Sequence, residues 1–284
     1  TPFTFSFREP SKMSSPLLSL DMATIGYGDK IIAEKIRLQI TPSSRIGLLG
    51  MNGAGKSTLI KTLVGDLPLL AGERKASELL NIGYFAQHQM DALDANASPM
   101  LQLARIADKQ ISEASLRAFF FFFFFSRERM DTACESFSGG ERARLALALI
   151  VWQRPNVLIL DEPTNHLDLD MRHALSMALQ DFEGAVVLVS HERQLIASVC
   201  DDLLLVHAGR CTEFEGDLQD YAKWLREARQ QLINSQNAVQ QQTVASQNTA
   251  AKVDKEAQRK EAARRRELTR PIRKNIEKVE GQID

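Results

Sequence analysis

A glycine-rich run that ends in Lys56 and Ser57 is the first feature of this sequence with a recognisable chemistry. It has the spacing G-x-x-x-x-G-K-[ST] and follows a short apolar run, Arg45–Leu49, that predicts a buried strand. Glycines let the backbone curl so that its N–H groups face phosphate oxygens, and the start of a helix predicted over Ser57–Gly65 favours the same anion. The spacing therefore predicts a phosphate-binding loop made of Gly50, Met51, Asn52, Gly53, Ala54, Gly55, Lys56, Ser57 and Thr58. In such a loop the lysine reaches the β- and γ-phosphates and the serine ligates Mg²⁺.

Two acidic residues, Asp161 and Glu162, follow directly after the apolar run Val157–Leu160. We expect Asp161 to hold Mg²⁺ through water, and Glu162 to orient and deprotonate an attacking water. Taken alone, a strand that ends in a solvated acidic turn explains these residues equally well. Beside the phosphate-binding loop, the catalytic interpretation is favoured.

A second small-residue run, Ser138-Gly139-Gly140-Glu141, opens a helix predicted over Gly140–Gln153. Small residues before a helix N-terminus make another anion site, although a serine in this place is more often only an N-cap. One nucleotide rarely needs two such phosphate sites.

Short apolar runs alternate with helical patterns along the chain, which indicates an α/β fold with parallel strands in its core. Strands are expected at Leu17–Met22, Ile31–Ile40, Arg45–Leu49, Asn81–Phe85, Val157–Leu160, Ala185–Val189, Leu203–His207 and Cys211–Phe214. Helices are expected at Ser57–Gly65, Pro99–Ala107, Ser112–Ala118, Gly140–Gln153 and Leu169–Gln180. Seven consecutive phenylalanines, Phe119–Phe125, fit neither period, and seven rings cannot all face one small core. We interpret this run as an irregularity of the recorded sequence and assign it no role.

The composition restricts the class of protein. The 284 residues are 44% hydrophobic, enough for a large core. Three cysteines without C-x-x-C spacing argue against a disulfide framework or a zinc site and favour a reducing compartment. No signal peptide is visible, and no apolar run approaches the roughly 18 residues of a membrane helix. We therefore expect a cytoplasmic protein with no membrane partner.

The C-terminal part differs from the rest in charge. Residues 226–284 hold 13 Lys and Arg against 8 Asp and Glu, a net charge of +5, whereas the first 225 residues carry −6. A polar stretch, Gln231–Ala251, predicts a flexible tether or a weak helix. After it, Leu268, Ile272, Ile276, Val279 and Ile283 form one apolar stripe at helical spacing, interrupted near Pro271. Such a stripe is typical of a helix that pairs with another helix.

In order and spacing, the motifs resemble an ATP-binding cassette over about Leu17 to Trp224. The matching segments are Gly50–Thr58, Gln87, Ser138–Arg142, Leu160–Asp168 and His191. The resemblance implies a P-loop NTPase fold with a mixed sheet core, a small antiparallel β subdomain and a helical subdomain, and it implies ATP and Mg²⁺ as ligands. In that family the run at Ser138 is the signature motif, which binds the γ-phosphate held by an opposite cassette.

Further roles come from this resemblance residue by residue. Tyr27 would stack on adenine, Gln87 would contact Mg²⁺ and the attacking water, and His191 would contact the γ-phosphate. Ser138, Gly139, Gly140 and Glu141 would bind the ATP of the opposite cassette. The alternatives are that Tyr27 is an ordinary turn tyrosine, Gln87 a polar loop residue and His191 a structural histidine.

The run Asp161–Asp168 resembles the ABC-F family, as does Phe137–Arg142, where Glu141 replaces the glutamine usual in transporters. ABC-F proteins carry two cassettes in one chain without a membrane domain, and several act on ribosomes. The basic tail resembles the C-terminal extension of bacterial YheS-like or Uup-like members. The chain departs from the family at Phe119–Phe125, where a glycine-rich stretch is common.

We therefore expect a fragment of an ABC-F ATPase that needs a second cassette, from its parent chain or a second copy, for turnover. The expected organisation is an interdomain linker at residues 1–16, a cassette at 17–225, a polar tether at 226–251 and a truncated basic helical extension at 252–284. Ribosome or RNA is the expected partner. DNA binding through the tail, or service as the ATPase subunit of a membrane transporter, are the alternatives.

Overall fold

The computed structural model of the chain describes residues 4–10 and 12–280, apart from the side chains of residues 244–248, 279 and 280. Thr1–Phe3 and Ser11 of the predicted linker lie outside the described residues, as do Ile283 and the side chain of Val279 in the predicted stripe. The chain divides into two compact units, Thr1–Tyr221 and Ala222–Asp284.

A six-stranded sheet with the order β5-β6-β7-β3-β8-β9 forms the centre of the first unit. Neighbouring strands pair in parallel, except β8 and β9, which are antiparallel. The strands are β3 (Arg45–Leu49), β5 (Ile82–Phe85), β6 (Val157–Asp161), β7 (Ala185–Val189), β8 (Asp202–His207) and β9 (Arg210–Glu213). Because parallel strands end at the same edge, the loops that follow β3, β6 and β7 meet there.

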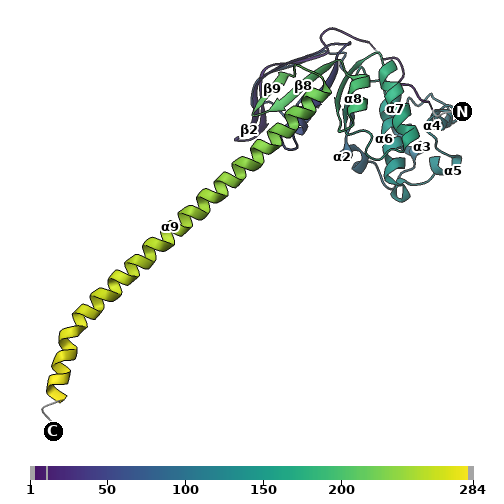
Figure 1. The fold of residues 1–284 in the computed structure, drawn as a ribbon. Helices are drawn as coiled ribbons and strands as arrows, with labels where there is room; N and C mark the ends of the chain where they lie inside the picture. Colours follow the sequence, from purple (N-terminus) through teal and green to yellow (C-terminus); the bar gives the residue numbers. More distant parts are fainter. Residues whose placement is uncertain (1–3, 11, 281–284) are drawn as a thin grey trace. The chain divides into compact units, whose positions relative to one another are not determined.

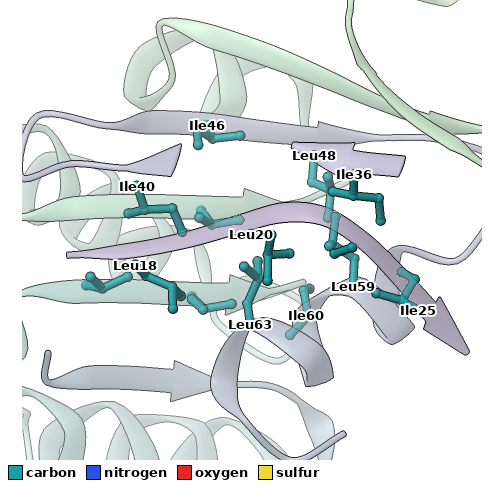
Figure 2. Packing of buried hydrophobic residues seen from close by; sticks show 14 of the residues in the cluster. Leu18, Leu20, Ile25, Ile36, Ile40, Ile46, Leu48, Leu59, Ile60 and Leu63 are labelled. Carbon is teal, nitrogen blue, oxygen red and sulfur yellow. The ribbon is translucent and has the colours of Figure 1, made fainter. Parts of the chain in front are cut away.

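A second, antiparallel sheet has the order β2-β1-β4, with β1 at Leu18–Tyr27, β2 at Lys30–Ile40 and β4 at Ala71–Ala76. Helix α1 (Lys56–Val64) belongs to the same hydrophobic cluster as both sheets. Figure 2 shows Leu59, Ile60 and Leu63 of α1 beside apolar side chains of β1 and β2, with Ile46 and Leu48 of β3 nearby. Burial on both faces explains why β3 is an almost continuous apolar run.

The remaining helices of the first unit are α2 (Gln87–Asp91), α3 (Pro99–Ile106), α4 (Glu113–Phe121), α5 (Arg127–Met130), α6 (Gly139–Trp152), α7 (Leu169–Asp181) and α8 (Arg193–Val199), with a 3₁₀ turn at Cys134–Ser136. Serine side chains cap four of them: Ser98, Ser112, Ser126 and Ser138 each accept a hydrogen bond from the backbone N–H three residues on. The expected P-loop NTPase fold, with its antiparallel and helical subdomains, is confirmed.

The phenylalanine run closes α4 and continues through a turn. Phe120, Phe123 and Phe125 are buried, whereas Phe121, Phe122 and Phe124 are exposed. This division agrees with the argument that seven rings cannot share one small core.

Helix α9 runs without interruption from Leu218 to Glu280 (Figure 1). It includes the polar stretch 231–251, for which the sequence leaves a flexible tether or a weak helix open, and it continues through Pro271, near which the predicted apolar stripe is interrupted. Within a helix proline removes one hydrogen bond, and here the helix persists on both sides of that loss. None of the helices in the described part of the chain is long and apolar enough to cross a membrane.

Candidate functional site

The predicted phosphate-binding loop joins the carboxyl end of β3 to the start of α1. Three of its glycines have positive φ: Gly50 at 150°, Gly53 at 81° and Gly55 at 114°. At Gly50 a Cβ would lie 2.6 Å from the carbonyl oxygen of Val206, which no side chain tolerates. The loop therefore requires glycine both for its backbone conformation and for its close approach to β8.

Lys56 opens α1, and its Nζ donates a hydrogen bond to the carbonyl oxygen of Gly50 at 2.6 Å. Gly55, the N-cap of α1, supplies no side-chain acceptor, and the first N–H groups of a helix have none within it. Such a helix start attracts an anion. Burial lowers the pKa of Lys56, although the carboxylates of Glu162 and Asp161 oppose this effect.

One pocket of about 380 Å³ brings half of the predicted site residues together. Its lining comprises Ile32, Asn52, Gly53, Gly55, Lys56, Ser57, Thr58, Asp161, Glu162, Val189 and His191. A lysine, a glycine-rich backbone and a helix start suit nucleotide phosphates. The Ser57 hydroxyl and the Asp161 carboxylate are oxygen donors of the kind that Mg²⁺ prefers, so this donor set fits the expected cofactor.

The two acids stand where β6 ends. Burial raises the pKa of Asp161, and Lys56, His88 and His191 act against this shift. Burial also raises the pKa of Glu162, opposed mainly by His191. A carboxylate with a raised pKa is a stronger base than one in water, which suits removal of a proton from a bound water.

Glu162 and His191 are in direct contact. The His191 Nε2 lies 3.2 Å from Glu162 Oε1, and the His191 backbone N–H donates to Glu162 Oε2 at 3.3 Å. Glu162 also has a positive φ of 50°, and its N–H bonds to the carbonyl of Val189 at 2.8 Å. The turn after β6 therefore holds a non-glycine residue in a conformation that costs free energy, a frequent property of functional positions.

Gln87 is not part of this pocket. Its Oε1 lies 2.8 Å from His166 Nε2, and its Nε2 donates to Asp91 at 3.2 Å. His166 in turn lies against the start of α6. Its Nδ1 is so close to Gly139 that a Cβ on this glycine would be 3.1 Å away. The structure thus places His166 between Gln87 and the signature residues, a position that sequence spacing does not reveal.

Ser138, Gly139, Gly140 and Glu141 begin α6 and also lie outside the pocket. Ser138 is the N-cap and forms a capping box with Glu141, which pairs with Arg129 on α5. Ser138 is therefore a helix cap, as the simpler interpretation of the sequence has it. The same helix start still offers backbone N–H groups that can bind an anion.

Tyr27 ends β1 with 46% of its surface exposed, available for stacking, but it is not part of the pocket lining. Sequence reasoning missed Tyr221, near the start of α9, whose hydroxyl accepts a hydrogen bond from the Gly50 N–H at 3.1 Å. No local pattern marks this residue, since the two partners are 171 positions apart.

Comparison with known proteins agrees with this site. The family model described as "ABC transporter" matches residues 33–165. This range contains the phosphate-binding loop, the signature residues and the two acids after β6.

Three relatives are similar over most of the chain. The "Probable ATP-binding protein YheS" of Escherichia coli (strain K12) is 53% identical over 230 residues, which are 81% of this chain and 36% of that protein. YheS of Haemophilus influenzae is 49% identical over 84% of this chain and 38% of its own. "ATP-binding cassette sub-family F member 3" of Homo sapiens is 40% identical over 76% of this chain and 30% of that protein. The chain thus spans about a third of the length of these relatives.

Two solved structures share the fold. A bacterial Atm1-family ABC exporter with ATP bound matches with a TM-score of 0.63 and 22% identity, over 80% of this chain and 45% of that one. The ATP-binding cassette MJ0796, in a dimeric post-hydrolysis state with ADP and Pi, matches with a TM-score of 0.58 and 18% identity, over 70% of this chain and 99% of that one. The loop geometry, the pocket and these relatives together lead to one conclusion: the chain carries an ATP-binding cassette of the ABC-F type, which is an ATPase domain.

Proposed function

We propose that this chain binds MgATP in the pocket between α1 and the carboxyl edge of the large sheet, and hydrolyses it when a second cassette closes over the nucleotide. The observation that carries the proposal is the convergence of Lys56, Ser57, Asp161, Glu162 and His191 on one pocket. These residues come from three separate segments, and a chance glycine loop does not explain their meeting.

Each residue then has a distinct role. The loop amides and Lys56 bind the phosphates; Ser57 and Asp161 would hold Mg²⁺, which would supply positive charge beside the phosphates. Glu162 removes the proton of the attacking water, and His191, in contact with Glu162, contacts the γ-phosphate and orients that water. Tyr27 stacks on adenine. Gln87, which contacts His166 in the structure, would leave it to contact Mg²⁺ and the water.

The separation of the signature residues from the pocket supports pairing. Ser138, Gly139 and Gly140 offer a helix N-terminus that this chain's own pocket does not use. A second cassette, from the same parent protein or a second copy, would place each signature motif against the other cassette's γ-phosphate. Loss of that phosphate on hydrolysis would favour reopening.

In this proposal the paired cassettes close and reopen on ribosomes in the cytoplasm. The ABC-F resemblance favours it, and the net charge of +5 over residues 226–284 suits RNA phosphates. In this proposal residues 1–16 are the end of a linker, 17–225 the cassette, 226–251 a polar connection, and 252–284 the start of a basic helix with a coiled-coil partner. Leu268, Ile272 and Ile276 are exposed on that helix, as an unpaired stripe must be.

Co-sedimentation with ribosomes tests the proposal. The Glu162→Gln variant, in this chain and in its longer parent, should pellet with ribosomes in MgATP but not in MgADP, because it binds ATP and stays closed. The Lys56→Ala variant is the matched control and should not pellet. A parent that binds ATP and never pellets would exclude the ribosome as partner.

DNA is the second candidate, because the basic tail suits any nucleic acid backbone. Deletion of Lys252–Asp284 should abolish binding to a DNA duplex or junction while ATP binding is retained. DNA binding that survives this deletion would contradict the idea. If both nucleic acids fail to bind, co-purification with a membrane protein in detergent tests the transporter alternative.

A further inference from the structure

The start of α6 carries a negative charge where the proposed pairing requires attraction for an anion. Glu141 is the third residue of the helix, and its side chain is only 15% exposed. If Ser138, Gly139 and Gly140 hold a γ-phosphate, an unpaired carboxylate beside them would repel it. Burial opposes ionisation of Glu141, but hydrogen bonds from Ser138 and the contact with Arg129 together lower its pKa. The carboxylate is therefore ionised at neutral pH.

Arg129 meets this carboxylate with two contacts. Its Nε lies 2.9 Å from Glu141 Oε2, and its Nη2 donates to Glu141 Oε1 at 2.9 Å. This two-point geometry matches the planar guanidinium to the carboxylate, and it fixes the orientation of both groups as well as cancelling their charges.

The guanidinium is also held by the segment that leads into α6. Its central carbon lies 5.0 Å from the ring centre of Phe137, and Nη1 donates to the hydroxyl of Ser136 at 3.4 Å. Phe137 is buried and directly precedes the cap residue Ser138. Arg129 thus contacts the helix start both before and after its cap.

The cap depends on the same carboxylate. Glu141 Oε1 accepts from the Ser138 N–H at 3.2 Å, while the Ser138 Oγ accepts from the Glu141 N–H at 3.2 Å. Glu141 Oε1 is therefore shared between Arg129 and the cap. The N–H groups of Gly139 and Gly140, at the first two helical positions, have no acceptor within the helix.

We propose that Arg129 is a positioning residue for the second phosphate site. It neutralises Glu141 and fixes the capping box, so that Ser138, Gly139 and Gly140 present a net positive helix start to the γ-phosphate bound by the opposite cassette. The inference rests on the proposed pairing of cassettes. It gives Glu141 a supporting role in place of the direct nucleotide contact implied by the family resemblance.

The test uses the full chain with Glu162→Gln, which is expected to trap the closed pair. Sedimentation velocity at increasing MgATP gives the concentration at which half of the protein is paired. Arg129→Gln should raise this midpoint roughly ten-fold, because it leaves an unpaired carboxylate beside the phosphate. Adding Glu141→Gln to Arg129→Gln should return the midpoint close to that of Glu141→Gln alone. Arg129→Lys, which keeps the charge and loses the two-point contact, should lie between.

Arg117→Gln is the matched control. Arg117 lies on α4 and pairs with Asp131 and Glu113 rather than with the start of α6. Its loss should leave the pairing midpoint unchanged. Binding of a fluorescent ATP analogue to the unpaired chain should be the same with and without the added substitutions, since Arg117, Arg129 and Glu141 do not line that chain's own pocket.

The outcomes separate the inference from the function on which it rests. An unmoved midpoint in Arg129→Gln, or a double variant as impaired as the single one, overturns the role of Arg129 and leaves the pairing intact. If the chain with Glu162→Gln alone never pairs in MgATP, the proposed pairing fails, and the role of Arg129 fails with it.

Discussion

The start of α1 and the start of α6 both offer backbone N–H groups to an anion, but they are built in different ways. At α1 the groups belong to a glycine loop with positive φ angles, and a lysine supplies the charge. At α6 the backbone is regular, and side chains cap the helix and balance its charge. The anion site at α1 depends on backbone conformation at the end of a central strand, whereas the one at α6 depends on a network of side chains.

This difference has consequences for tolerance to change. Three loop glycines adopt angles that other residues rarely reach, so substitutions there disturb the fold and the site together. At α6 a single cap or ion pair can be removed without forcing the backbone into another conformation. Substitutions at α6 can therefore separate phosphate binding from stability more cleanly.

The largest expected effect concerns turnover. Glu162→Gln should lower the ATPase rate of the paired protein about 10²- to 10⁴-fold, because it removes the general base. ATP affinity should be retained, which assigns chemistry to the pocket beside α1 rather than to α6. Phosphate release and equilibrium nucleotide binding are the two measurements. Asp170→Asn, an exposed acid on α7, is the control, and persistent turnover in Glu162→Gln would require another base.

Lys56→Ala and Ser138→Ala test which of the two helix starts binds the ATP of the unpaired chain. The unpaired chain should bind ATP roughly ten- to a hundred-fold more weakly, because a charge-assisted contact to phosphate is lost. Lys61→Ala, on the last turn of the same helix, should have no such effect. Ser138→Ala should also leave ATP binding by the unpaired chain unchanged. Calorimetric titration measures all three, and a loss with Ser138→Ala would mean that α6 serves its own chain's nucleotide.

Tyr221→Phe tests the dependence of the loop on distant support. The buried Gly50 N–H would lose the hydroxyl that accepts its hydrogen bond, at a cost of about 1–3 kcal/mol in the free energy of unfolding. Urea denaturation measures the change. Tyr27→Phe is the control, because Tyr27 is 46% exposed. Equal stability in both variants would show that Gly50 finds another acceptor.

The smallest expected effect is that of the α6 cap on stability. Ser138→Ala should cost about 1 kcal/mol of unfolding free energy, as caps typically do. Ser112→Ala, at the cap of α4, should cost a similar amount. Only Ser138→Ala should also weaken MgATP-dependent pairing. If Ser138→Ala and Ser112→Ala had the same effect on pairing, α6 would have no special part in pairing.

Much of the fold follows from local sequence. The runs at Arg45–Leu49, Val157–Leu160 and Ala185–Val189 predict the three strands that position the pocket, because buried parallel strands are almost continuously apolar. Strand β4 was missed because Ala71–Ala76 has scarcely a buried side chain and therefore no alternation. The short helices α2, α5 and α8 were missed because four to seven residues are too few to show a helical period.

The residues of the candidate site also divide into those that local sequence predicts and those that it does not. Motif spacing indicates Lys56, Ser57, Asp161 and Glu162, because their functions need fixed offsets from a strand or a glycine loop. Tyr221 and Arg129 act through contacts with residues from other elements, and their positions carry no local signal. For residues 231–251 the sequence left a flexible tether and a weak helix open, since polar composition alone does not distinguish a solvated helix from a tether, and the structure has the helix.

The central place of β3 bears on how ligand binding can be observed. This strand is hydrogen-bonded to β7 on one side and β8 on the other, and the phosphate-binding loop begins at its end. Amides in such a strand exchange with deuterium chiefly when the whole folded unit opens. A nucleotide that binds only the folded unit should slow their exchange by the factor 1 + [L]/Kd. Deuterium uptake at Ile46–Leu49 therefore reports nucleotide affinity without any label on the nucleotide, whereas the solvent-exposed helix after residue 225 should exchange at a rate that nucleotide leaves unchanged.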